Sequence, residues 1–156
     1  MGQTAASFIS TFRDSLETTI QADASFPNVP VFIVDEGTSG LIEHVTLIRP
    51  ESEVGFSQEH AAFGRGSRND EFTLPGQFVV LATGQSTEDS ATFETAMARA
   101  EDLLELIIGE IKTNPPSVGT QTLRTIVGSG GMRPARVDQG WVVVCDFDIE
   151  ALVRVS

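Results

Sequence analysis

The chain has 156 residues, with 22 acidic and 10 basic side chains and a formal net charge of −12. This length fits a single domain over residues 1–156, and a hydrophobic content of 40% is enough to build a core. The negative charge disfavours wrapping of nucleic acid and docking on anionic membranes, since both require many cations. One cysteine excludes an intrachain disulfide and a cysteine-rich zinc site. We expect no signal peptide and no membrane-spanning segment, and therefore a soluble protein made in a cytoplasm.

The first third of the chain predicts one helix and two strands. Apolar residues recur every three to four positions over residues 4–22, which indicates one face of an amphipathic helix. Residues 29–34 and 42–48 are rich in β-branched side chains, and the polar, glycine-containing segment 35–40 separates them. Two such runs joined by a turn-like segment predict a β-hairpin.

The middle of the chain contains a segment without any period. Residues 50–71 mix glycines, charges and scattered aromatics, which predicts a long loop, a kind of segment that tends to be functional or mobile. Strand signals follow at 72–74 and 78–82, and Pro75 and Gly76 interrupt them.

The remaining elements have clearer patterns. An apolar stripe over residues 90–112 predicts a long helix, and residues 121–127 are typical of a strand. Apolar and polar side chains alternate over residues 141–155, which predicts one long strand with a core face and a solvated face. The order is α-β-β-β-α-β-β. It predicts an α+β fold with a mostly antiparallel sheet of four to five strands and two main helices packed against it.

Groups that carry catalysis are scarce. His44 and His60 have no further ligands at a spacing that would hold a metal, and we expect His44 to be a half-exposed strand residue. The glycine-rich segments 64–68 and 128–131 lack the phosphate-loop patterns. No nucleophile elbow is present. We therefore predict that the protein is not an enzyme and that it holds no cofactor and no metal.

The last predicted strand carries a thiol on one face and carboxylates on the other. Cys145 shares the apolar phase, so we expect a small buried hydrophobe and not a nucleophile. Asp146, Asp148 and Glu150 share the opposite face. A solvated strand face explains the three carboxylates, and a site for a hard cation such as Ca²⁺ is the alternative.

Charge is distributed unevenly. No acidic residue lies between Glu110 and Asp138, whereas the long predicted helix is strongly acidic. A solvated surface is one interpretation. Head-to-tail assembly is the other, in which the basic stretch of one subunit contacts the acidic helix of the next; heterologous contacts of this kind can close into rings.

The order of several segments along the chain is similar to that of a known protein family. The loop Gln58–Arg68 leads into Asp70–Leu74, then into a helix with Ala-Met-Ala-Arg-Ala-Glu at residues 96–101, and then into the terminal alternating strand. In this order the chain resembles the tail terminator (tail completion) proteins of long-tailed bacteriophages. The resemblance covers nearly the whole chain. It rests on the order of the elements and on local residue patterns, without a diagnostic motif.

The resemblance implies a structural virion protein that forms a hexameric ring. Such a ring caps the tail tube and joins the tail to the head, and genome DNA passes through it without sequence-specific binding. The implied partners are further copies of the chain, the tail tube protein and a head completion or connector protein, with no membrane. The implied location is the neck of the virion, after assembly in the host cytoplasm. Two alternatives remain: a head-side connector or stopper protein of the neck, and a small-molecule-binding or enzymatic α+β domain that uses the loops 50–71 and 128–136 as a pocket.

Three segments are candidates for the interface between subunits: the long loop, a basic turn and the acidic helix face. In the loop, aromatic residues would be apolar anchors, or would fold back onto the core, and arginines would pair with carboxylates. The candidate residues are Phe56, Phe63, Arg65 and Arg68 in the loop, Arg133 and Arg136 in the turn, and Glu94, Glu101 and Glu105 on the helix.

Overall fold

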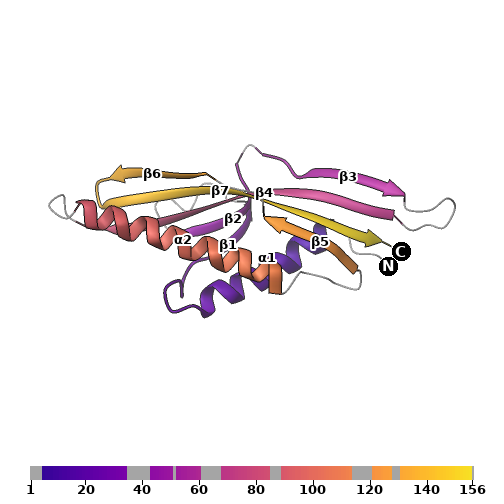
Figure 1. Ribbon diagram of the computed structural model, residues 1–156, viewed down its shortest axis with the longest axis horizontal. Coiled ribbons are helices and arrows are strands. Elements are labelled where there is room, and N and C mark those ends of the chain that lie inside the picture. The colour runs from indigo at the N-terminus through magenta and orange to yellow at the C-terminus, as the bar shows by residue number, and fades with distance from the viewer. Residues whose placement is uncertain are drawn as a thin grey trace.

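The computed structural model describes residues 5–34, 43–50, 52–60, 68–84, 89–113, 121–127 and 131–155. These residues form two helices and seven strands, in the order α1 (Ala5–Ala22), β1 (Val31–Val34), β2 (His44–Ile48), β3 (Gly55–His60), β4 (Arg68–Thr83), α2 (Asp89–Thr113), β5 (Gln121–Val127), β6 (Met132–Val137) and β7 (Gly140–Val155). Both helices lie on the same face of the sheet (Figure 1). The predicted α+β class is confirmed.

The sheet is organised around the long antiparallel pair of β4 and β7. Its main path is β1-β2-β4-β7-β5, with β3 added beside β4 and β6 added beside β7. The β4–β7 pair runs from Arg68 opposite Val155 to Thr83 opposite Gly140. β3 and β2 pair with different parts of β4, residues 68–73 and 77–79. β6 and β5 likewise pair with residues 140–145 and 149–154 of β7.

This pairing divides the sheet into two halves. The near half contains β1, β2, β6 and the adjoining parts of β4 and β7. The far half contains β3, β5 and the other parts of β4 and β7. Between them the described sheet narrows, because by strand register only β4 and β7 are paired at residues 75–76 of β4 and 147–148 of β7. We call this narrow region with its flanking rows, residues 74–77 of β4 and 146–149 of β7, the waist.

The core forms between the helices and one face of the sheet. Alternate residues of β4 and β7 point to this face, as the period of two requires. The largest side chains that are fully buried here come from both helices, β2, β4, β7 and the segment after α1; they are Phe12, Leu16, Ile20, Phe26, Leu47, Phe72, Leu74, Phe78, Leu103, Ile107 and Phe147. The predicted core face of the last strand is confirmed from Val143 to Ile149, and the side chains of residues 151–155 lie outside the described part.

The two helices also share a polar contact. Glu110 of α2 is buried, and its carboxylate accepts hydrogen bonds from the hydroxyls of Ser15 and Thr19 of α1, the latter at 2.7 Å. Because burial of a carboxylate is costly without hydrogen bonds, these two hydroxyls stabilise the contact between α1 and α2.

The predicted hairpin of the first two strands is wrong. β1 and β2 are parallel, with Val31 opposite Val45. Parallel neighbours need a crossover in place of a tight turn, and a local residue pattern does not encode strand direction. The connection at residues 35–42 lies outside the described residues.

The predicted loop over residues 50–71 is also wrong in part. Gly55–His60 and the start of β4 form an antiparallel hairpin, whereas residues 61–67 lie outside the described part. Pro75 and Gly76 do not interrupt β4, because the backbone bond at this edge runs from the N–H of Arg49 to the carbonyl of Pro75 and needs no N–H from the proline. Proline, which lacks an N–H, is tolerated at such a position.

Candidate functional site

Two of the four candidate residues of the predicted long loop lie in the far half of the sheet. Phe56 lies on β3 opposite the buried Phe72, and Arg68 begins β4 opposite Val155. The register therefore places Phe56 beside a core position. Phe63 and Arg65 lie outside the described residues.

The predicted basic turn is an edge strand, β6, and its arginines bind within the subunit. Arg133 forms an ion pair with Asp146 at 2.5 Å. Arg136 lies 2.7 Å from Asp89 and donates to the carbonyl of Gly140 at 2.8 Å. The turn was predicted because Pro134 and the preceding glycines suppress a strand signal, but proline is allowed at a sheet edge.

The three acidic candidates on α2 are exposed, as a surface helix face requires. Glu94, Glu101 and Glu105 all lie on the solvent side of the helix, and Arg133 and Arg136 have carboxylate partners elsewhere in the subunit. The structure of one chain does not bring the acidic and basic candidates together. Their contact between subunits stays a prediction.

Asp89 is a structural residue that the sequence analysis missed. Besides the Arg136 pair, it accepts a hydrogen bond from the Trp141 indole at 3.0 Å, and the Trp141 ring packs edge-on against Phe93 at 5.0 Å. Asp89 thus ties the first turn of α2 to β6 and β7, and its negative charge also suits a helix N-terminus. Its partners lie far away in the sequence, so no local pattern could have identified it.

A second tie joins α2 to the beginning of β2. The Arg99 guanidinium binds both carboxylate oxygens of Glu43, at 2.5 and 2.6 Å, and lies 4.4 Å from the centre of the Phe26 ring. Glu43 also accepts the N–H of Leu81 at 3.0 Å. The hydrogen bond to Glu43 raises the pKa of Arg99. A two-point arginine–carboxylate contact stacked on an aromatic ring is well suited to positioning a helix.

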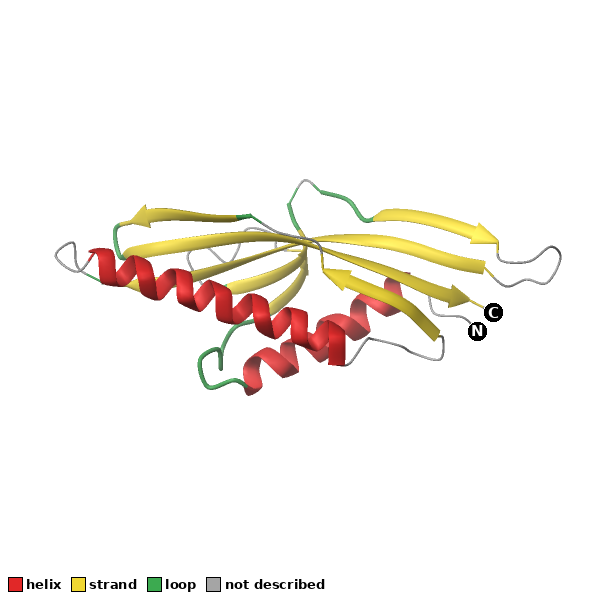
Figure 2. Ribbon diagram, in the orientation of Figure 1, coloured by secondary structure: helices red, strands yellow, loops and turns green. Residues whose placement is uncertain are grey.

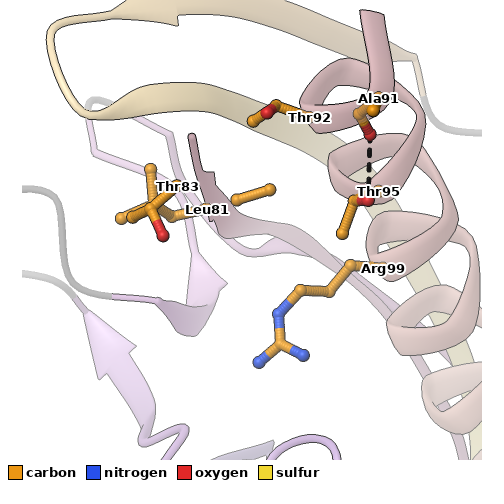
Figure 3. Close-up of a pocket in the computed structure, with 7 residues that line it drawn as sticks. Leu81, Thr83, Ala91, Thr92, Thr95 and Arg99 are labelled. Atoms are coloured by element: carbon orange, nitrogen blue, oxygen red, sulfur yellow. Dashed lines mark hydrogen bonds between the residues drawn. The ribbon is translucent and has the colours of Figure 1, made fainter. Parts of the chain in front are cut away.

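A cavity of about 570 Å³ opens beside Arg99 (Figure 3). It is lined by β4 and α2 through Leu81, Ala82, Thr83, Ala91, Thr92, Thr95 and Arg99. The Thr95 hydroxyl donates to the carbonyl of Ala91 at 2.9 Å, and the guanidinium is bound to Glu43. The described lining residues thus offer hydroxyls and methyl groups, and none of them pairs a nucleophile with a base.

Two other sequence expectations can be compared with the structure. His44 is 4% exposed, so the expected half-exposed position is wrong; its ring lies 5.9 Å from that of Phe32, which packs beside it from the neighbouring strand. Cys145 is buried as predicted, and its burial raises the pKa of the thiol, which disfavours the reactive thiolate.

The carboxylates at the waist bind arginines. Asp146 accepts hydrogen bonds from Arg133 and from the Gln77 amide, and the first of these contacts lowers the pKa of Asp146. Asp148 lies 3.6 Å from Arg49. Among the residues that the structure describes, no group of three or more histidines, cysteines or carboxylates could hold a metal ion.

Comparisons with protein-family models and with curated proteins found no match to this chain. Neither of the two described helices is long and apolar enough to span a membrane.

Proposed function

We propose that the protein is a structural virion protein that forms a ring, hexameric in the complete assembly, which caps the tail tube and joins the tail to the head. The observation that carries the proposal is the projection of the far half of the sheet. β3 and the adjoining ends of β4 and β7 reach beyond the ends of both helices (Figure 2). The specific role, which is to cap the tail tube and join the tail to the head, comes from the resemblance in element order to the tail terminator proteins.

The lengths of the central strands and of α2 support the proposal that the far half contacts a neighbouring subunit. β4 and β7 have 16 residues each, which corresponds to about 50 Å of strand. The 25 residues of α2 correspond to only about 37 Å. A compact domain of this chain length has a diameter of about 40 Å. The central strands therefore extend further than the helices can cover, and a second copy of the chain can cover the remainder.

The edges of the near half are protected in part against additional strands, at Val31 of β1 and along β6, whereas Ile33 and Val34 of β1 are exposed. At β1, the N–H of Val31 donates to Glu17 at 3.0 Å, and Arg13 donates to the carbonyl of Val31 at 2.8 Å. The ion pair of Arg13 and Glu17 thus takes the place of a neighbouring strand. At β6, Pro134 and two charged side chains protect the edge, which is how proteins commonly avoid unwanted strand pairing.

The edge of the far half at β3 has no such protection in its backbone. β3 pairs with β4 over all six of its residues, without a bulge and without a proline. No other described strand pairs with β3. An edge of this kind can accept a strand from a neighbouring subunit, because its outer N–H and C=O groups are available for pairing.

The net charge of −12 suits a channel for DNA in transit. A ring of such subunits produces a negative field that repels phosphate, which would keep the genome from adhering to the wall.

Isolated tail tubes that lack heads test the proposal. Purified protein is added to such tubes, and negative-stain images are scored for a ring on one end. We expect rings on one end and tubes that then become competent to join filled heads. Binding to heads but not to tubes would favour the head-side connector role, and binding to neither would contradict both.

A deletion variant tests whether the far half makes the ring. Deletion of residues 55–66 removes β3 but leaves β4 from Arg68 onward, and the expected product is a folded monomer that does not cap tubes. Ser10→Ala, an exposed change on α1 outside the candidate interface residues, is the control and should form rings. Capping by the deletion variant would exclude β3 as the contact.

A further inference from the structure

We infer that the waist is a hinge between the near half and the far half, and that two arginine contacts, from Arg49 and Arg133, hold its angle. The inference follows from the pairing of the sheet and does not depend on the proposed ring. Within the ring, the hinge would let the far half adjust its direction toward a neighbouring subunit while the near half keeps its core.

The first argument is the width of the sheet. At the waist only β4 and β7 connect the two halves of the described sheet, whereas five strands lie abreast in the near half and four in the far half. Two-stranded ribbons twist more strongly than wider sheets, since no further ladders restrain them. Bending at the waist therefore disturbs the fewest hydrogen bonds.

The second argument is the chemistry of β4 at this point. Pro75 has no N–H to donate, and Gly76 has no side chain. The ring of Phe147 occupies the space beside Gly76, where a Cβ atom would lie only 2.3 Å from Cε2 of the ring. At Pro75 and Gly76 the strand thus carries little bulk or pairing capacity of its own, and the Phe147 ring fills the space beside Gly76.

The first contact comes from Arg49, directly after β2. Its backbone N–H donates to the carbonyl of Pro75 at 2.7 Å, and its guanidinium donates to the carbonyl of Gly76 at 2.9 Å. The same guanidinium lies 3.4 Å from the carbonyl oxygen of Phe147 and 3.6 Å from the carboxylate of Asp148. Arg49 therefore occupies the place of the missing third strand and spans both strands of the waist.

The second contact comes from Arg133 of β6. Its guanidinium binds Asp146 of β7, which also accepts the Gln77 amide at 2.8 Å. Both arginines belong to the near half, and both reach acidic residues of β7 in the waist. The Arg133 side chain is 58% exposed, so salt or a carboxylate of a partner can compete for it.

Distances between spin labels test the hinge directly. Labels at Ala98 on α2 and Ser57 on β3 report the angle between the halves, and labels at Ala98 and Ala135 on β6 report the near half alone. A Cys145→Ala background removes the native thiol. We expect Arg49→Ala with Arg133→Ala to broaden and shift the distance distribution of the first pair, and to leave the second pair unchanged.

Two outcomes would overturn the inference. In one, the distribution between Ala98 and Ser57 stays as narrow as that of the near-half pair after both arginines are removed, which would show a rigid waist. In the other, both distributions broaden together, which would show general loosening. The variant Arg13→Ala, which removes an arginine contact of the near half away from the waist, controls for the loss of charge. Because the assay uses the isolated chain, failure of ring formation leaves its result interpretable.

Discussion

The near half and the far half share the same two central strands and differ in what surrounds them. In the near half, α2 packs on the sheet through two side-chain ties, Arg99 with Glu43 and Trp141 with Asp89, and the edges are protected at Val31 of β1 and along β6. In the far half the strands reach past the helices, and the β3 edge carries neither proline nor bulge (Figure 2). The two halves therefore differ in how far the helices and side-chain ties cover them, and the proposed contact with a neighbouring subunit falls in the half that is covered less.

The largest expected effect comes from the near-half core. Phe78 is fully buried, with its ring 6.3 Å from that of Phe147. Phe78→Ala should lower the free energy of unfolding by about 3–5 kcal/mol, since it removes the side chain and leaves a cavity. Urea denaturation followed by circular dichroism measures it. The adjacent Val79, which is partly exposed on the opposite face, is the matched control, and an equal loss for Val79→Ala would contradict the assignment of the core face.

The waist should respond next. Gly76→Ala places a methyl group against the Phe147 ring, so we expect a loss of about 1–3 kcal/mol in the free energy of unfolding. Gly109→Ala on α2 is the control, because no atom lies within 4 Å of the added carbon. The control should be neutral or stabilising by up to about 1 kcal/mol, since alanine restricts the unfolded chain. A neutral Gly76→Ala would show that the waist is more open than described.

The tie at the start of α2 should have a smaller effect. Asp89→Ala leaves the Trp141 indole and Arg136 without their shared acceptor, and should cost about 1–2 kcal/mol of unfolding free energy. Tryptophan fluorescence should also change, because the indole loses its hydrogen bond. Glu94→Gln, one turn along the same helix, should change neither quantity. The same contact means that reversing the charge of Arg136 damages the fold as well as any interface.

The smallest effect is the pH dependence of the Arg133–Asp146 pair. The pKa of Asp146 is lowered in the folded protein by its hydrogen bond from Arg133. The pair therefore stabilises the fold above the pKa of an unfolded aspartate, and this contribution disappears as the pH falls through the lower folded value. Because Arg133 is exposed, the contribution of this pair to the free energy of unfolding should be below about 1 kcal/mol.

Stability curves of the native chain and of Asp146→Asn check this dependence. The difference between them should be largest near neutral pH and should vanish in acid. A difference that grows as the pH falls would contradict the assignment.

Local patterns predict part of this fold well. The spacing of Phe12, Leu16 and Ile20 and the alternation from Trp141 onward locate α1 and β7, because each pattern follows from one element packing on one core. The direction of β1 against β2 depends on a crossover and leaves no local signal. β3 was missed because Ser57, Gln58 and Glu59 are polar in sequence and gain their strand conformation by pairing with β4.

The candidate site was predicted less well, for a related reason. Arg133 and Arg136 are basic residues near a turn, which is also the pattern of an interface, and only the structure shows their partners Asp146 and Asp89. Pairs between residues far apart in the sequence depend on register, and register is not visible in composition. Contacts that form only between subunits are harder still to predict from the sequence, because they depend on the fold of each subunit and also on how the subunits are arranged.

The mass of the purified protein, measured by light scattering across concentration and then in the presence of isolated tail tubes, tests the central claim most directly. The account predicts a species of six subunits, in solution or on the tube end, and its loss when residues 55–66 are deleted. A protein that stays monomeric at every concentration and also on tail tubes would contradict it.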